Sequence, residues 1–268
     1  MQACRACAAP LTHEFVDLGQ SPISNAMRDP AKAHEAEAFY PLRTFVCERC
    51  KLVQLETFQI AEEHFHGGYS YFSSFSQSWL DHAKRYAEMA TARFSLGPRS
   101  HVVEVASNDG YLLQYFKMAG IPVLGIEPAA NCADVATRER GIPTLVRFFG
   151  TATAAELAAS KQADLIVANN VLAHVPDIND FTAGLGRLLA PGGVITLEFP
   201  HLLQLIERCY FDTIYHEHYS YLSLLAVDRL LTKHGLTVFD LEELPTHGGS
   251  LRLFVRHAAG APAPSQQV

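Results

Sequence analysis

The chain has 268 residues, which fits one large domain or a medium domain with a small attachment. Apolar residues make up 49% and mean hydropathy is +0.05, so the chain can bury a core and a disordered protein is excluded. The formal net charge is -7 and no Lys/Arg run occurs, which disfavours a nucleic-acid partner.

The N-terminal region carries two pairs of cysteines, Cys4/Cys7 and Cys47/Cys50, each with two residues between partners. With no signal-peptide pattern and no long apolar run, we expect a cytoplasmic chain without a membrane span. Disulfides are rare in that compartment. Two such knuckles offer four thiolates in a tetrahedron, which suits Zn²⁺ and leaves no open position. We therefore expect structural zinc; four independent buried or redox cysteines are the alternative.

Residues 51–100 are expected to be helical and connecting, with a loop at 67–71 and a helix over 78–94. From residue 101 onward strands alternate with helices, which predicts a parallel sheet covered on both faces. The seven expected strands end in a hairpin and match the plan of a class I methyltransferase, an α/β, Rossmann-like, seven-stranded sheet. These strands span 101–106, 121–126, 144–149, 165–168, 194–199, 236–241 and 251–255.

Three parts follow from this pattern. We expect a zinc-binding module over 1–66, an S-adenosylmethionine-binding methyltransferase domain over 67–257 and a disordered tail over 258–268.

The first strand of the expected sheet ends in a turn of small residues, and the second ends in Glu127-Pro128, with Glu127 placed 23 residues after Glu104. Such a turn lets a ligand approach the backbone, and a carboxylate at the second strand end can accept both hydroxyls of a ribose. The turn lacks G-x-G-x-x-G, so a methyl donor is favoured over a nicotinamide cofactor, which stays the alternative. The expected cofactor-binding residues are Glu104, Ala106, Ser107, Asn108, Gly110, Glu127, Pro128, Asn169 and Asn170.

A cluster of His, Glu and Tyr residues, Tyr215–Tyr221, follows the fifth strand. Active sites of α/β sheets form at the carboxyl ends of strands, and a His beside a Glu can serve as a general base. His174, just after the fourth strand, is expected near the same edge. A second zinc site or a hydrogen-bonded surface loop is the alternative, although His216-Glu217-His218 does not have H-E-x-x-H spacing.

Together these pieces resemble the sugar-nucleotide C-methyltransferases of deoxysugar biosynthesis. The resemblance extends over nearly the whole chain and rests on the paired Cys-x-x-Cys knuckles and on segments 102–113, 169–177, 215–221 and 246–252. It implies methyl transfer from S-adenosylmethionine to C-3 of a nucleotide-linked 4-keto-6-deoxysugar, with a dTDP-sugar as the expected partner.

The resemblance also implies roles for individual residues. His218 would be the base, and Glu217 would orient it or tune its charge. Tyr215 and His174 would hydrogen-bond the sugar or its enolate oxygen. Tyr69 would cover the site from the side of the zinc module. Family members carry a further C-terminal nucleotide-binding-like domain that has no counterpart after Arg256, so we expect weak binding of the sugar nucleotide.

Two other functions stay open on the sequence. One is methylation of an oxygen or nitrogen of another small molecule, and the other is a non-catalytic module that binds S-adenosylmethionine and zinc. The sequence does not indicate an oligomeric state.

Overall fold

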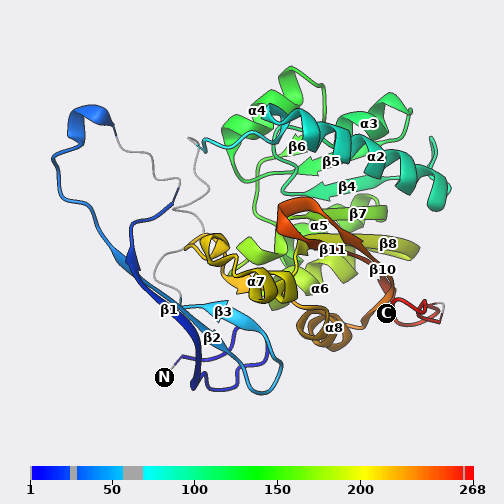
Figure 1. The fold of residues 1–268 in the computed structure, drawn as a ribbon. Helices are drawn as coiled ribbons and strands as arrows, with labels where there is room; N and C mark the ends of the chain where they lie inside the picture. Colours follow the sequence, from blue (N-terminus) through cyan, green and yellow to red (C-terminus); the bar gives the residue numbers. More distant parts are fainter. Residues whose placement is uncertain (1, 25–28, 57–68, 262) are drawn as a thin grey trace.

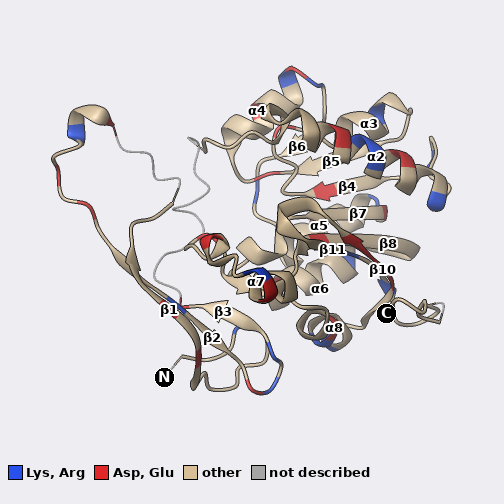
Figure 2. Ribbon diagram, in the orientation of Figure 1, with Lys and Arg blue, Asp and Glu red and all other residues tan. Residues whose placement is uncertain are grey.

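The computed structural model of the chain describes residues 2–24, 29–56, 69–261 and 263–268. Two β-sheets lie side by side, a small N-terminal one and a larger one covered by helices (Figure 1). Lys and Arg residues are interspersed with Asp and Glu residues over both parts (Figure 2). Among the described residues, no helix has the length and apolar character needed to cross a membrane.

The larger sheet has seven strands in the order β10-β11-β8-β7-β4-β5-β6. Strands β8, β7, β4, β5 and β6 are parallel, whereas β11 runs antiparallel to both β8 and β10. This confirms the expected fold, a parallel sheet with a terminal hairpin. Its strands are β4 (Val102–Val105), β5 (Val123–Ile126), β6 (Thr144–Leu145), β7 (Ala163–Asn169), β8 (Leu189–Pro200), β10 (Leu236–Leu244) and β11 (Ser250–His257).

Two apolar layers cover the two faces of this sheet. Successive residues of a strand point to opposite faces. Val102 and Leu165 accordingly pack in one buried cluster, and Val103 and Ile166 in the other. The central strands are therefore apolar on both faces, as parallel strands buried under helices must be.

The described helices are α2 (Gln77–Arg93), α3 (Leu113–Met118), α4 (Ala130–Arg138), α5 (Thr151–Ser160), α6 (Ile178–Leu188), α7 (Leu202–Arg208) and α8 (Leu224–Lys233). Short 3-10 turns are η1 (Pro30–Lys32), η2 (Ser73–Phe75), η3 (Leu172–His174), η4 (Phe211–Thr213) and η5 (Thr246–Gly248). Helix α7, a seven-residue segment after β8, was not expected from the sequence.

The small sheet has the order β1-β2-β3-β9 and is antiparallel throughout. Its strands are β1 (His13–Ser21), β2 (Tyr40–Val46), β3 (Val53–Leu55) and β9 (Ser220–Tyr221). The expectation that residues 51–100 are only helical and connecting is wrong at β3, because three residues are too few to show strand periodicity. Strand β9 comes from the segment after α7, so the small sheet is completed by a distant part of the chain.

The expected boundary between residues 66 and 67 lies outside the described residues. In the expected tail, the Ser265 amide donates to the carbonyl of Phe239 at 2.9 Å.

Candidate active site

A cavity of about 600 Å³ opens at the carboxyl ends of β4, β5 and β7. Its size lies within the roughly 300–1,000 Å³ usual for small-molecule sites. The cavity brings together eleven of the residues singled out in the sequence, from segments far apart in the chain. They are Tyr69, Ala106, Asn108, Glu127, Pro128, Asn169, Asn170, His174, Tyr215, Glu217 and His218.

Three of the expected cofactor residues, Glu104, Ser107 and Gly110, do not line this cavity. Glu104 is 1% exposed, and burial, followed by the negative charges of Asp109 and Glu127, raises the pKa of its carboxyl group well above the usual value. A side chain at Gly110 would press on α4 and Ile142, and Gly110 has a φ of +77°. These residues shape the turn from behind the cavity wall.

The turns that reach the cavity contain non-glycine residues in the left-handed region of backbone space. Ala106 has φ 57°, Asn108 has φ 49° and Asn170 has φ 54°. Asn adopts this conformation more readily than other residues, whereas an Ala pays roughly 1–2 kcal/mol for it. Strain of this kind is common where a backbone must approach a ligand. In this turn Ala106 and Asn108 therefore adopt the positive φ angles for which glycine is the default residue.

Glu127 lies at the end of β5 with its carboxylate toward the cavity. Its Oε2 accepts the amide of Asn108 and its Oε1 accepts the amide of Ala129, each at 2.8 Å. Burial raises the pKa of this carboxyl to about 6, against the lowering effect of those amide bonds. Each oxygen keeps a further lone pair, so the group can still accept two ribose hydroxyls.

Asn169 and Asn170 add polar groups at the end of β7. The buried Oδ1 of Asn169 and both amide atoms of Asn170 have no hydrogen-bond partner among the described residues, and both residues line the cavity. Buried polar groups are normally satisfied. Together with Glu127, these groups fit a ligand with several hydroxyl and amino groups, as S-adenosylmethionine has.

His218 is held in one defined state on the other side of the cavity. Its Nδ1 lies 2.8 Å from the Thr213 carbonyl oxygen, which can only accept, so Nδ1 carries the proton. Its Nε2 then accepts from the Tyr215 hydroxyl at 2.9 Å. Burial lowers the pKa of His218 to about 4. The imidazole is therefore neutral near pH 7, with its basic nitrogen on the side of Tyr215.

Aromatic rings surround His218. The rings of His174 and Tyr215 lie 4.6 Å and 4.1 Å from its own, measured between centroids. Burial raises the pKa of Tyr69 and of Tyr215, with the negative charge of Glu217 as the next cause for both. Both phenols are thus protonated near neutral pH and can donate a hydrogen bond to a developing negative charge.

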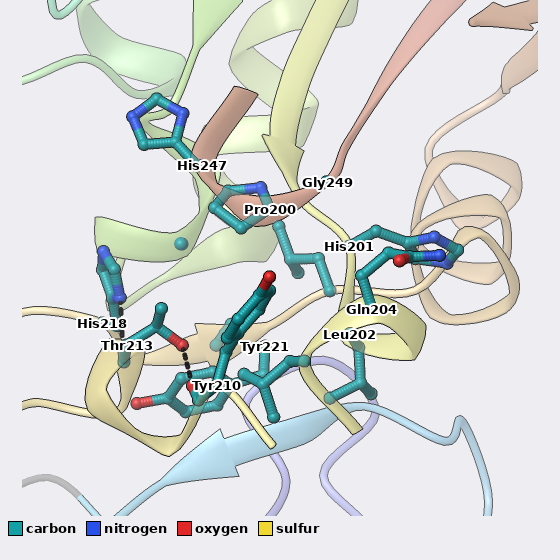
Figure 3. Close-up of a pocket in the computed structure, with 14 residues that line it drawn as sticks. Pro200, His201, Leu202, Gln204, Tyr210, Thr213, His218, Tyr221, His247 and Gly249 are labelled. Carbon is teal, nitrogen blue, oxygen red and sulfur yellow. Dashed lines mark hydrogen bonds between the residues drawn. The ribbon is translucent and has the colours of Figure 1, made fainter. Parts of the chain in front are cut away.

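A second, smaller cavity of about 30 Å³ lies beside His218 (Figure 3). Ala173, Pro200, His218 and His247 line both cavities. The small one has room for a group the size of one water molecule or methyl. His218 is thus one of four residues that lie between the two cavities.

Not every residue of the 215–221 cluster faces the cavity. His216 is 4% exposed and its Nε2 bonds the carbonyl of Pro41 in the small sheet at 3.1 Å. Adjacent residues point in different directions, which explains why only part of the cluster can act on a ligand. Among the described residues, the cysteine group is the one set able to hold a metal, so the second zinc site has no support there.

The sequence did not single out several residues that line the cavity, including Tyr71, Trp79, Tyr111 and His247. His247 has φ 51°, and its ring lies 5.1 Å from that of Trp79, which stacks on His82 at 4.8 Å. A detectable signal was present for His247, since it precedes two glycines in the hairpin. Trp79 gave none, because it looks like an ordinary residue of an amphipathic helix.

The four cysteines of the N-terminal knuckles converge. Their sulfur atoms all lie within 4.8 Å of one another, with Cys4–Cys50 and Cys7–Cys47 at 3.5 Å. Tetrahedral zinc with Zn–S bonds of about 2.3 Å places its sulfurs about 3.8 Å apart. The cluster therefore brings four sulfurs to within about 1 Å of the spacing that tetrahedral zinc requires. Of the other two cysteines, Cys132 is buried and Cys209 is exposed.

Comparison with known proteins agrees with this geometry. Family models of a zinc binding domain and of a methyltransferase domain match residues 4–65 and 54–241. The chain is 35% identical over 257 residues to the C-methyltransferase NovU of Streptomyces niveus. The aligned region covers 96% of this chain and 61% of NovU. It thus spans less than two thirds of that relative.

Solved structures share the fold at low sequence identity. The PH0226 protein of Pyrococcus horikoshii OT3 has a TM-score of 0.56 at 16% identity, over 70% of this chain and 94% of its own. The magnesium protoporphyrin IX methyltransferase of Synechocystis PCC 6803, with bound SAH, has a TM-score of 0.53 at 15% identity, over 66% and 82%. The chain therefore belongs to the methyltransferase domain family: it has the class I fold that binds S-adenosylmethionine, preceded by a zinc-binding module.

Proposed function

We propose that this chain is the donor-binding and proton-abstracting part of a C-methyltransferase that acts at C-3 of a nucleotide-linked 4-keto-deoxysugar. One observation carries the proposal: a neutral imidazole with a basic nitrogen, His218, lines the same cavity as the carboxylate Glu127. The 35% identical relative named as a C-methyltransferase supports the choice of carbon as the acceptor atom.

Carbon methylation needs a base, and this requirement fits the acceptor side of the cavity. A ketone acidifies the neighbouring C–H, and removal of that proton leaves an enolate whose carbon is nucleophilic. S-adenosylmethionine, when bound, supplies a methyl group on a positively charged sulfur. The enolate carbon would form the new C–C bond as the C–S bond of the donor breaks, S-adenosylhomocysteine would leave, and the proton would stay on the base.

His218 is proposed to take the proton at Nε2. The Thr213 carbonyl, which accepts from Nδ1, would stabilise the imidazolium that forms. Tyr215 would turn its hydroxyl from Nε2 to the enolate oxygen, and His174 and Tyr69 would contact the sugar. Glu217, buried at 2% exposure, would balance the positive charge. Because the pKa of His218 lies near 4, this role predicts that kcat/KM for the acceptor, measured at saturating S-adenosylmethionine, keeps its value as pH falls through 6.5.

The donor side would hold the cofactor through Glu127 at the ribose and through the turn at Ala106 and Asn108, with the polar side chains of Asn169 and Asn170 close by. A role in deoxysugar biosynthesis, a dTDP-sugar as acceptor and a cytoplasmic location belong to the same proposal.

The decisive experiment separates proton removal from methyl transfer. The protein is incubated in D₂O with a dTDP-linked 4-keto-6-deoxysugar, without a methyl donor, and deuterium at C-3 is followed by NMR. We expect enzyme-dependent exchange that His218→Asn abolishes. Added S-adenosylmethionine with a ¹³C methyl should then give a C–CH₃ signal; an O–CH₃ or N–CH₃ product would replace this proposal by the alternative chemistry.

A further inference from the structure

We propose that Gln54 is a positioning residue that links metal binding at the four cysteines to the loop carrying His218. The inference rests on the role proposed above for His218. Its physical links are contacts within the described residues, and they make the zinc-binding module part of the acceptor side of the active site.

Gln54 is tied to the first cysteine knuckle by both ends of its side-chain amide. Its Nε2 donates to the sulfur of Cys4 at 3.2 Å, and its Oε1 accepts the backbone amide of Arg5 at 2.9 Å. The residue is 1% exposed, so these bonds are shielded from water. An amide that donates to a metal-bound thiolate fixes the orientation of that ligand, and a partner of this kind commonly matters 10- to 100-fold for affinity or activity.

The backbone of Gln54 is tied to the loop that carries His218. Strand β3 pairs with β9 in a short antiparallel ladder that sets Gln54 opposite Ser220 and Val53 opposite Tyr221. The amide of Leu55 also donates to the carbonyl of Tyr219 at 3.0 Å. This ladder begins two residues after His218, so its register fixes the C-terminal end of the loop.

Arg5 forms a second connection between the same two regions. It sits between Cys4 and Cys7, and its guanidinium donates to the carbonyl of Leu55 at 2.8 Å. The same group lies over the ring of Tyr219, 5.3 Å from its centroid, and donates to the carbonyl of Pro176, which lines the large cavity. Arg5 thus joins the first cysteine knuckle to Tyr219, next to His218, and to Pro176 in the cavity wall.

These contacts predict the consequence of losing the metal. With zinc bound, Cys4 is a fixed thiolate and Gln54 has one possible orientation. Without zinc, the four sulfurs lose their common centre, and the acceptor of Gln54 is no longer held in place. Strand β3 then loses an anchor, and β9, with only two residues in the ladder, follows it. His218 should then lose its position, whereas Glu127 and Asn108, which bond each other, should keep theirs.

The test compares Gln54→Met with Gln20→Met. Methionine keeps the length of the side chain and lacks both amide bonds; Gln20 is an exposed residue of the same sheet and serves as the control. For Gln54→Met we expect about one zinc per chain, S-adenosylmethionine affinity unchanged within about twofold, and kcat about 10-fold lower or more. Hydrogen exchange of segment 213–221 should be faster, with no change in α3, which packs in the other apolar layer of the large sheet.

A readout independent of turnover keeps the inference separate from the proposed reaction. Chelation of zinc should speed exchange of segment 213–221 in the unsubstituted protein, and this holds even if the acceptor substrate has been chosen wrongly. In Gln54→Met the exchange should already be fast with zinc still bound. Slow exchange in that variant would overturn the inference, as would loss of its zinc, because Gln54 would then be part of the metal site alone.

Discussion

The two sides of the large cavity are built in different ways. On the cofactor side, Ala106, Asn108, Glu127 and Asn169 stand at or just after the ends of adjacent parallel strands. On the acceptor side, the loop with His218 is held between the methyltransferase sheet and a strand of the N-terminal sheet. The proposed cofactor side therefore depends on the local βα pattern, whereas the proposed acceptor side depends on pairing between segments about 165 residues apart, as Gln54 and Ser220 are.

Because of this difference, the two sides should respond differently when another part of the chain is altered. A turn at a buried strand end keeps its geometry as long as the sheet folds. A loop closed by a two-residue strand keeps it only while a second module is folded and in register. Changes in the N-terminal module should therefore impair the acceptor chemistry and leave donor binding intact.

The largest effect is expected on removal of a zinc ligand. Structural zinc is worth about 10–16 kcal/mol of binding free energy in small zinc modules, so Cys47→Ser should release the metal and unfold the N-terminal module. Turnover should fall below detection, while calorimetry on the fraction that stays monomeric still shows S-adenosylmethionine binding. The exposed Cys209→Ser is the matched control and should keep its zinc. Full turnover by a metal-free Cys47→Ser protein would show that the His218 side does not depend on the N-terminal module.

The second effect concerns the proposed base. His218→Asn should lower turnover about 10²- to 10⁴-fold, the usual contribution of a general base, and leave the Kd of S-adenosylmethionine unchanged. His13→Asn, an exposed histidine of β1, is the control. Equal losses of donor affinity and turnover in His218→Asn would mean that the two sides are not separable.

The reverse pattern is expected from Glu127. A hydrogen bond to a charged acceptor contributes about 1.5–3 kcal/mol, so loss of even one of the two ribose contacts should weaken S-adenosylmethionine binding roughly 10- to 100-fold. In Glu127→Ala, measured by calorimetry, C-3 deuterium exchange without donor should continue at its original rate. The exposed Glu139→Ala should bind normally. Unchanged donor affinity in Glu127→Ala would mean that Glu127 does not bind the ribose.

The smallest effect is a change in protonation. Burial raises the pKa of Glu127 to about 6, so near that pH part of the free protein carries a neutral carboxyl group. Ribose hydroxyls donate to the ionised form, so S-adenosylmethionine should bind with release of a fraction of a proton near pH 6 and almost none at pH 8. Calorimetry in buffers of different ionisation enthalpy measures this directly. Proton uptake on binding at pH 6 would have the wrong sign for this contact.

The same contrast explains what could be predicted from the sequence. The alternation of strands and helices and the doubled cysteine spacing are local patterns, and they predicted the sheet, the turn near Ala106 and the cysteine cluster. Strand β3 has three residues and β9 has two, which is too short for a periodic signal. The pairing of Gln54 with Ser220 and the position of Trp79 in the cavity wall are set by tertiary packing. No spacing of residues in the sequence predicts them.

The shared edge between β3 and β9 also bears on how the molecule can be divided. A methyltransferase domain produced without the N-terminal module would expose the backbone donors and acceptors of segment 219–221 that now pair with β3. An uncovered strand edge recruits other chains. Self-association and low solubility are thus expected of the separated domain, so cutting the chain between the two modules would produce an aggregation-prone fragment instead of two independent units.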